Sequence, residues 1–397
     1  MRLNGLIVAA ALTAAACTPE LEFTEVQTEL SGAIGFLDVS VLPSLADDGD
    51  MLFAGEHPMT GEQALFYYDG ATVTRIDIAP AGYSEVTSVA VISDGRAAFI
   101  GRRDAGMTDF IGVYSTTLPA AASSTTLLEA DVTALPPSLA LIPQDNVALA
   151  ENGTVAFHNV RDGMGAIWRG PVEGPVAVLR QATGTYFNAQ RLDVNDGGTV
   201  AVQMEYGDPT MGLSRGILLF ESPGDTLATI DTAIEKLSVG SQPLPSINAD
   251  GNVAFALPFG AIIDFFDPPD DANGTVVETL DLDAGVYVAT PTPFGDPSDV
   301  TVIADDTGGE YTAFTRTVRH NDDGRVVFQA TTVEGDGGVF FGPSRIANRI
   351  LAQGDMLDGR LFSFVTLADI NNQDRVALVA GDFISTDRTV WSVDLSP

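Results

Sequence analysis

The segment His320–Ala330, HNDDGRVVFQA, decides the fold because it joins a tight turn directly to a strand. The turn comes from residues 321–324, since Asn and Asp bond their own backbone and Gly accepts positive φ. The strand comes from residues 326–328, which are β-branched or aromatic. We therefore interpret the segment as part of an antiparallel β-hairpin.

The same turn-then-strand pattern occurs seven times along the chain, each time with a turn rich in Asn, Asp and Gly. The turns lie at residues 47–49, 93–95, 151–153, 195–198, 248–251, 321–324 and 371–374. After each turn comes a small residue, an aliphatic residue and usually an aromatic one. From the last residue of the turn to the last of these three residues, the distance is 15 to 20 residues, except in the fifth repeat, where it is 36. Such regularity indicates a tandem-repeat fold.

Two further strand patterns in most repeats bring each unit to four short strands. Repeats of this size and content predict an all-β protein, a seven-bladed β-propeller of four-stranded antiparallel blades. Six blades are the alternative, because the first and seventh units diverge. We expect Trp168 and Trp391, which share a repeat position, to pack between blades. The last repeat stops after its third strand, so the segment Leu21–Gln27 is expected to close the last blade.

Residues 1–17 have the features of an export signal. Arg2 precedes an apolar run too short to span a bilayer, and small residues lead into Cys17, the single cysteine. This arrangement resembles a bacterial lipobox, which implies cleavage before Cys17 and its lipidation. Residues 18–397 then form a single propeller domain. Thr18 resembles the signal for the outer membrane, so we expect a lipoprotein of the outer membrane or cell surface; secretion is the alternative.

The chain is strongly acidic, with 54 Asp and Glu against 19 Lys and Arg and a net charge of −35. A surface this negative repels nucleic acid and anionic lipid head groups. We therefore expect no nucleic-acid partner and contact with a membrane only through the lipid. The same charge favours a soluble monomer.

The turn motif, clearest in Asn248–Phe255 and Asn321–Phe328, resembles the NxxGxxAF tandem repeats of bacterial surface proteins over about residues 45–380. The strand order is also similar to the TolB-type propeller repeat. The resemblance implies a repeat fold at the cell surface and implies no chemistry. Repeats one, four and seven depart from the motif, at Leu52, at Gly197–Gly198 and at Asp374.

The long fifth repeat contains an insert, Pro258–Asp283, which we expect between the second and third strands of its blade. Function concentrates in long loops on rigid scaffolds. We therefore predict that Phe265, Phe266 and Asp267 contribute to a binding surface; a loop without function is the alternative. The nearby carboxylates allow a structural Ca²⁺ ion, although neither a metal site nor a cofactor is predicted.

Three arginines and two histidines fall in loops expected on the same face as this insert. Arg102, Arg103 and Arg161 are candidates for holding an anionic ligand, with intramolecular salt bridges as the alternative. His57 and His158 are further candidates, with surface or satisfied core positions as the alternative.

No catalytic motif of the types HExxH, G-x-S-x-G, P-loop or CxxC occurs in the sequence. Catalytic residues therefore cannot be assigned, and we favour a non-enzymatic binding or scaffold module for a protein or glycan. The alternative is a propeller hydrolase or lyase acting on polysaccharide. Its signature would be a cluster of acids, His or Arg at the channel mouth, contributed by several blades.

Overall fold

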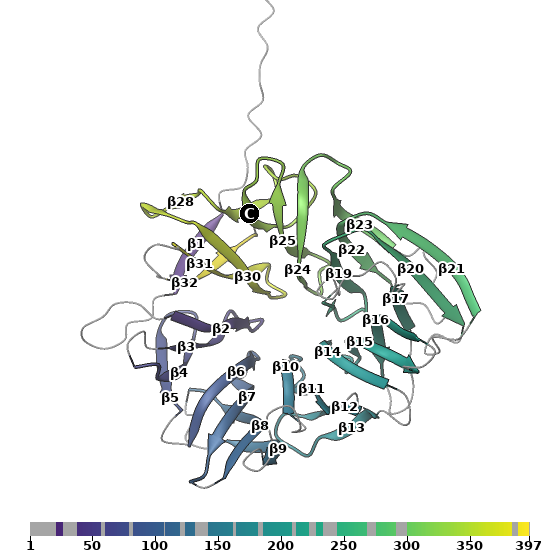
Figure 1. The fold of residues 1–397 in the computed structure, drawn as a ribbon. Helices are drawn as coiled ribbons and strands as arrows, with labels where there is room; N and C mark the ends of the chain where they lie inside the picture. Colours follow the sequence, from purple (N-terminus) through teal and green to yellow (C-terminus); the bar gives the residue numbers. More distant parts are fainter. Residues whose placement is uncertain are drawn as a thin grey trace, which may run out of the picture.

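The computed structural model is a closed ring of antiparallel sheets around a central axis (Figure 1). It describes residues 21–26, 38–56, 60–78, 82–106, 108–119, 124–131, 142–161, 164–181, 186–208, 212–221, 228–232, 244–267, 275–290, 300–382 and 388–396. Seven of its sheets have four strands, which confirms the seven-bladed β-propeller and excludes six blades. Within those ranges no helix is long and apolar enough to cross a bilayer.

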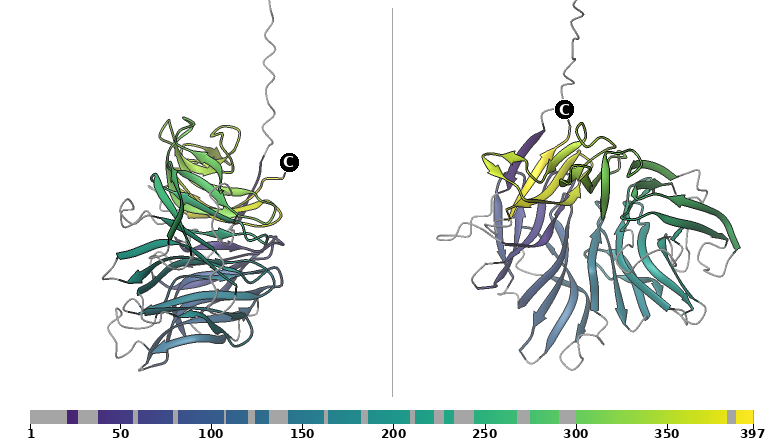
Figure 2. Two further views of the ribbon diagram at one scale, coloured as in Figure 1. Left: turned by 90° about the vertical axis from the view of Figure 1, so that its right-hand side faces the viewer. Right: turned by 45° about the horizontal axis from the view of Figure 1, so that its top comes forward.

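Each blade is an antiparallel meander, and Figure 2 shows the ring of blades from two further sides. Blades one to four consist, inner strand first, of β2 (Asp38–Leu45), β3 (Met51–Glu56), β4 (Gln63–Tyr68) and β5 (Val73–Asp77); β6 (Tyr83–Val91), β7 (Arg96–Asp104), β8 (Asp109–Thr117) and β9 (Thr125–Asp131); β10 (Ile142–Leu149), β11 (Thr154–Arg161), β12 (Met164–Pro171) and β13 (Ala177–Gln181); β14 (Tyr186–Val194), β15 (Val200–Asp208), β16 (Gly212–Phe220) and β17 (Ala228–Thr232).

Blades five to seven follow the same order, with two additional hairpins. They consist of β18 (Ser246–Ile247), β19 (Val253–Leu257), β22 (Gly285–Ala289) and β23 (Val300–Asp305); β24 (Tyr311–His320), β25 (Val326–Thr332), β26 (Gly337–Phe340) and β27 (Arg349–Ala352); β30 (Phe364–Ile370), β31 (Arg375–Gly381), β32 (Arg388–Asp394) and β1 (Glu22–Val26). The hairpins are β20 (Ala261–Asp267) with β21 (Thr275–Leu282), and β28 (Met356–Leu357) with β29 (Arg360–Leu361).

The N-terminal strand closes the ring as the sequence predicts. β1 pairs with β32 from Glu22 opposite Asp394 to Val26 opposite Val390. Val26 is buried in the cluster that joins blades seven and one. Glu25 also forms an ion pair with Arg360 at 2.8 Å. Because β32 is covered in this way, the last blade leaves no open edge at its third strand.

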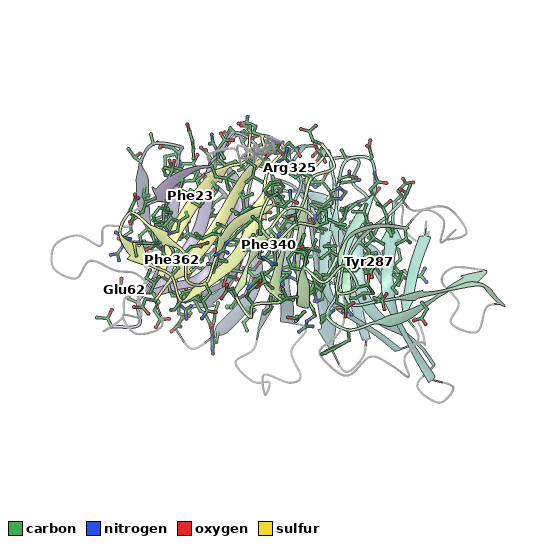
Figure 3. The ribbon with its side chains drawn as sticks, turned by 90° about the horizontal axis from the view of Figure 1, so that it is seen from above. Phe23, Glu62, Tyr287, Arg325, Phe340 and Phe362 are labelled. Atoms are coloured by element: carbon green, nitrogen blue, oxygen red, sulfur yellow. The ribbon has the colours of Figure 1, made fainter. Side chains whose placement is uncertain are left out.

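The two faces of the ring carry different connections. Arg325, directly after the sixth repeat turn, lies on one face, and Glu62, between β3 and β4, lies on the opposite one (Figure 3). We call the face with the seven repeat turns the repeat-turn face. The opposite face, with the second-to-third-strand turns and the blade-to-blade connections, is the connection face.

The Asn of the repeat motif joins neighbouring blades as well as forming its turn. Asn371 Oδ1 accepts a hydrogen bond from the Arg375 backbone N at 2.9 Å, and its Nδ2 donates to the Ala46 carbonyl of the next blade at 2.9 Å. Asn195 and Asn321 make equivalent bonds to blades five and seven. Each such bond contributes about 1 kcal/mol to stability.

Apolar and aromatic side chains fill the spaces between blades. Trp391 has no exposed area, which confirms its predicted packing role, and the partly buried Trp168 stacks on Phe157 with ring centroids 6.4 Å apart. The small residue of the second repeat signal has a steric reason. A Cβ on Gly112 would lie 2.5 Å from the Leu128 carbonyl oxygen of the neighbouring strand and 2.9 Å from the Tyr114 hydroxyl oxygen.

Candidate functional site

The seven innermost strands enclose a channel along the ring axis with a cavity of about 410 Å³. Ligand pockets commonly have volumes of roughly 300–1,000 Å³. Every blade contributes a polar or charged residue to this lining. In order of the blades these are Ser44, Ser88, Asn146, Asp193, Ser246, Arg319 and Asp369.

These seven side chains tie the channel wall into a circle, because each bonds the backbone of the next blade. Six accept from a backbone N–H: Asp369 from Leu45 at 3.1 Å, Ser44 from Val91 at 3.2 Å, Ser88 from Val147 at 3.1 Å, Asn146 from Leu192 at 3.2 Å, Asp193 from Ile247 at 3.0 Å and Ser246 from His320 at 3.1 Å. Arg319 Nε completes the circle by donating to the Ala368 carbonyl at 3.0 Å. A ligand in the channel would therefore meet polar groups held in place.

Three members of this circle are charged. Arg319 Nε lies 3.4 Å from Asp369 Oδ1. Arg319 also donates Nη1 to the Val318 carbonyl at 3.1 Å, and its Nη2 has no partner among the residues that the structure describes. The Asp193 carboxylate accepts hydrogen bonds from the backbone N–H groups of Val194 and Ile247. It forms no ion pair with any residue that the structure describes. The channel thus presents a guanidinium edge and an unpaired carboxylate.

The surroundings of these carboxylates favour their protonated forms. Burial raises the pKa of Asp369 to about 6, with the nearby charge of Asp193 adding to the rise and Arg319 opposing it. Burial likewise raises the pKa of Asp193, and the positive charge of Arg319 partly opposes this rise. The Asp369 side chain keeps 25% of its area exposed, so the group remains accessible. A carboxyl group that titrates near neutral pH in a cavity is a feature of functional sites.

Four more carboxylates line the cavity at its end on the repeat-turn face: Asp47, Glu151, Asp196 and Asp322. They also hold the turns together. Glu151 accepts from the backbone N of Asp47 at 2.8 Å and of Ser93 at 3.1 Å, in blades whose turns lack the repeat Asn. Across the described part of the chain, no three Asp, Glu, His or Cys side chains converge as a metal site.

The arginines that the sequence suggests for an anionic ligand are held in ion pairs outside the channel. Arg102 bonds Asp109 through Nε at 2.9 Å. Arg103 makes a bidentate pair with Glu129, both bonds at 2.9 Å. Arg102 and Arg103 therefore form intramolecular salt bridges, which is the alternative given for them in the sequence analysis. The Arg161 side chain lies outside the described residues, although its backbone ends β11.

Of the two candidate histidines, His158 is described by the structure, and it lies in the core and not at a surface. His158 lies in β11 with no exposed area, and burial lowers its pKa to about 4. Neither ring nitrogen has a hydrogen-bond partner within the described residues. His158 is therefore a neutral residue of the core in this structure, although not a satisfied one. His57 lies outside the described residues.

The insert of the fifth repeat joins the second and third strands of its blade, as predicted, and forms the hairpin β20–β21. This hairpin lies beside β17, the outermost strand of blade four, at the periphery of the ring (Figure 1). Phe265, Phe266 and Asp267 end β20, and their side chains lie outside the described residues. Their binding role stays a prediction, as does a Ca²⁺ ion at this insert.

Sequence reasoning missed the charged channel residues, although a signal for them exists. Asp193, Ser246, Arg319 and Asp369 each stand two residues before the first residue of a repeat turn, and Ser44 stands three residues before one. Polar residues at a position that is expected to be a strand could have marked the channel wall, once the first strand of each blade was taken as innermost.

No protein-family model and no curated protein matches the chain. Solved structures of similar fold include a prolyl endopeptidase, at 12% identity over 91% of this chain and 50% of that one, with a TM-score of 0.52. Prolyl oligopeptidase B from Galerina marginata is 11% identical over 85% of this chain and 46% of that one, with a TM-score of 0.45. A glucose dehydrogenase is 14% identical over 78% of this chain and 96% of that one, with a TM-score of 0.38.

The likeness to the prolyl endopeptidase shows the fold alone, because the identity is below 25%. The chain spans about half the length of the two peptidases that it matches. The activities of those enzymes are therefore not transferred to this chain.

Proposed function

We propose that the chain is a non-enzymatic binding module, lipid-anchored at a bacterial cell surface, whose ligand enters the central channel. The observation that carries the proposal is the charged group Asp193, Arg319 and Asp369 in a polar cavity of about 410 Å³. Hydroxyl groups donate to carboxylates and accept from a guanidinium, so this wall suits a glycan. Capture of a protein instead would favour the scaffold role.

The lipid anchor is proposed from the sequence around Cys17, which lies outside the described residues. A Cys17→Ser variant is expected to move from the membrane fraction to the soluble fraction, because one thioether-linked lipid anchor is lost. Fractionation with fatty-acid labelling measures this. Equal labelling of parent and variant, or a parent protein without lipid, would contradict the anchor and favour secretion.

The channel is tested by thermal melts of the mature domain, residues 18–397, with soluble fragments of envelope glycans. A ligand that binds only the folded state raises the melting temperature. We expect Arg319→Gln to abolish the rise, because it removes the guanidinium that lines the cavity. The matched control is Arg102→Gln, whose side chain lies outside the channel in its pair with Asp109.

Loss of the rise in the Arg102 variant alone would instead locate binding on the connection face. If no glycan raises the melting temperature and the domain captures one envelope protein, the scaffold role is favoured.

One observation favours the second candidate, a hydrolase or lyase acting on polysaccharide. Two carboxylates share the cavity, and the pKa of Asp369 is raised to about 6, as suits a general acid near neutral pH. Paired carboxylates are the machinery of most glycoside hydrolysis. Release of reducing ends by the parent, lost in both Asp193→Asn and Asp369→Asn, would replace the binding proposal with this one.

A further inference from the structure

The charges around the channel are unequal. Among the described residues that line it are six carboxylates, Asp47, Glu151, Asp193, Asp196, Asp322 and Asp369, against two guanidinium groups, Arg191 and Arg319. Walls of low dielectric concentrate the field of such groups inside a cavity. The potential in the channel therefore favours a positively charged ligand over a neutral one and opposes an anion.

Asp193 provides the specific contact for that positive charge. Its carboxylate lines the cavity but has only backbone donors and the Ser246 hydroxyl as partners, with no ion pair in the described part of the chain. Arg319 is engaged with Asp369 at 3.4 Å instead. Burial raises the pKa of Asp193, so an ionised carboxylate without an ion pair is costly there, and a cation bound beside it would hold the carboxylate in its ionised form.

Arg319 supplies the second contact. Its Nη2 has no partner among the described residues and it lies in the same cavity as Asp193. A guanidinium donates and never accepts, so it requires an oxygen acceptor on the ligand. An ammonium group alone would leave that donor without a partner.

We infer that the channel binds a hydroxylated organic cation, of the amino-sugar class, with its ammonium on Asp193 and a hydroxyl oxygen on Arg319. This inference rests on the proposed function and specifies its ligand. It distinguishes this ligand class from acidic and uncharged sugars, which the sequence and the fold leave open.

The test compares three sugars that differ chiefly in charge, by calorimetric titration of the mature domain in low salt at about pH 6.5, below the pKa of the amine. Glucosamine is expected to bind at least tenfold more tightly than N-acetylglucosamine, and glucuronate least. Added NaCl is expected to weaken glucosamine binding specifically, since salt screens charge. Asp193→Asn is expected to remove the preference for glucosamine, because the affinity for glucosamine then falls at least to that for N-acetylglucosamine.

The control variant is Asp323→Asn, an exposed residue of a repeat turn that does not line the cavity. N-acetylglucosamine binding as tightly as glucosamine would overturn the inference and leave the channel as the binding site. Absence of binding by all three sugars would remove the channel as a small-ligand site, and the inference with it. If Asp193→Asn fails to fold, the salt dependence of the parent decides: unchanged glucosamine affinity in high salt overturns the inference.

Discussion

A chain shortened to begin at Gln27 is expected to melt at a much lower temperature and to associate, because it lacks the strand that closes the ring. Burial of Val26 contributes about 1.5–3 kcal/mol, and the half-buried Leu21 and Phe23 contribute roughly as much together. Removing β1 also opens the edge of β32 along five residue pairs. We therefore expect a loss of roughly 3–6 kcal/mol in stability, with exposed strand edges pairing between molecules.

Two point variants of the same strand separate closure from simple shortening. Val26→Asp places a charge in the core between blades seven and one, whereas Thr24→Asp adds the same charge at an exposed position of β1. Thermal melts and light scattering should show the defect for Val26→Asp and the short chain only. A short chain that melts with the parent and remains monomeric would show that three strands suffice for blade seven.

This closure could be predicted because its signals are local. The turn residues 321–324, repeated at near-constant spacing, specify a hairpin whatever surrounds them. The seventh repeat lacks a fourth strand, and an alternating segment near the N-terminus supplies one. Even the exception at Asp374 fits, since its φ of 59° is one that Asp tolerates and its carboxylate pairs with Arg325 at 2.9 Å.

The site could not be predicted in the same way, because it depends on contacts between blades. The repeat position that Asp193 and Asp369 share can mark both as residues of an inner strand, but it does not show that these two side chains, 176 residues apart in the sequence, line one cavity. Nor does the sequence show that Arg103 pairs with Glu129, on another strand of its own blade. The insert drew attention by its length, whereas its hairpin lies at the periphery, away from the channel (Figure 1).

Asp369→Asn is expected to stabilise the fold near pH 8 while it disturbs the charged group of the channel. The folded-state pKa of Asp369 is about 6, against 3.8 for an ordinary Asp, so above pH 6 the ionised group costs about 3 kcal/mol of folding free energy. Asn carries no charge, but it has one carbonyl oxygen for the two backbone donors of Leu45 and Ile370, which sacrifices about 1 kcal/mol. The expected net gain is about 2 kcal/mol at pH 8.

The pH dependence identifies the cause of that gain. As pH falls from 6 towards 3.8, folded Asp369 binds its proton before the unfolded chain does, so the parent recovers stability relative to the variant. Urea unfolding of both proteins at pH 8 and near pH 4 should therefore show the advantage of Asn at pH 8 and its loss near pH 4. The exposed Asp323→Asn serves as the control for charge removal. An advantage that persists unchanged at low pH would mean that packing, and not the raised pKa, explains it. A carboxylate retained at such a cost is expected where a ligand depends on its charge, which is why the same variant should bind the channel ligand less tightly than the parent.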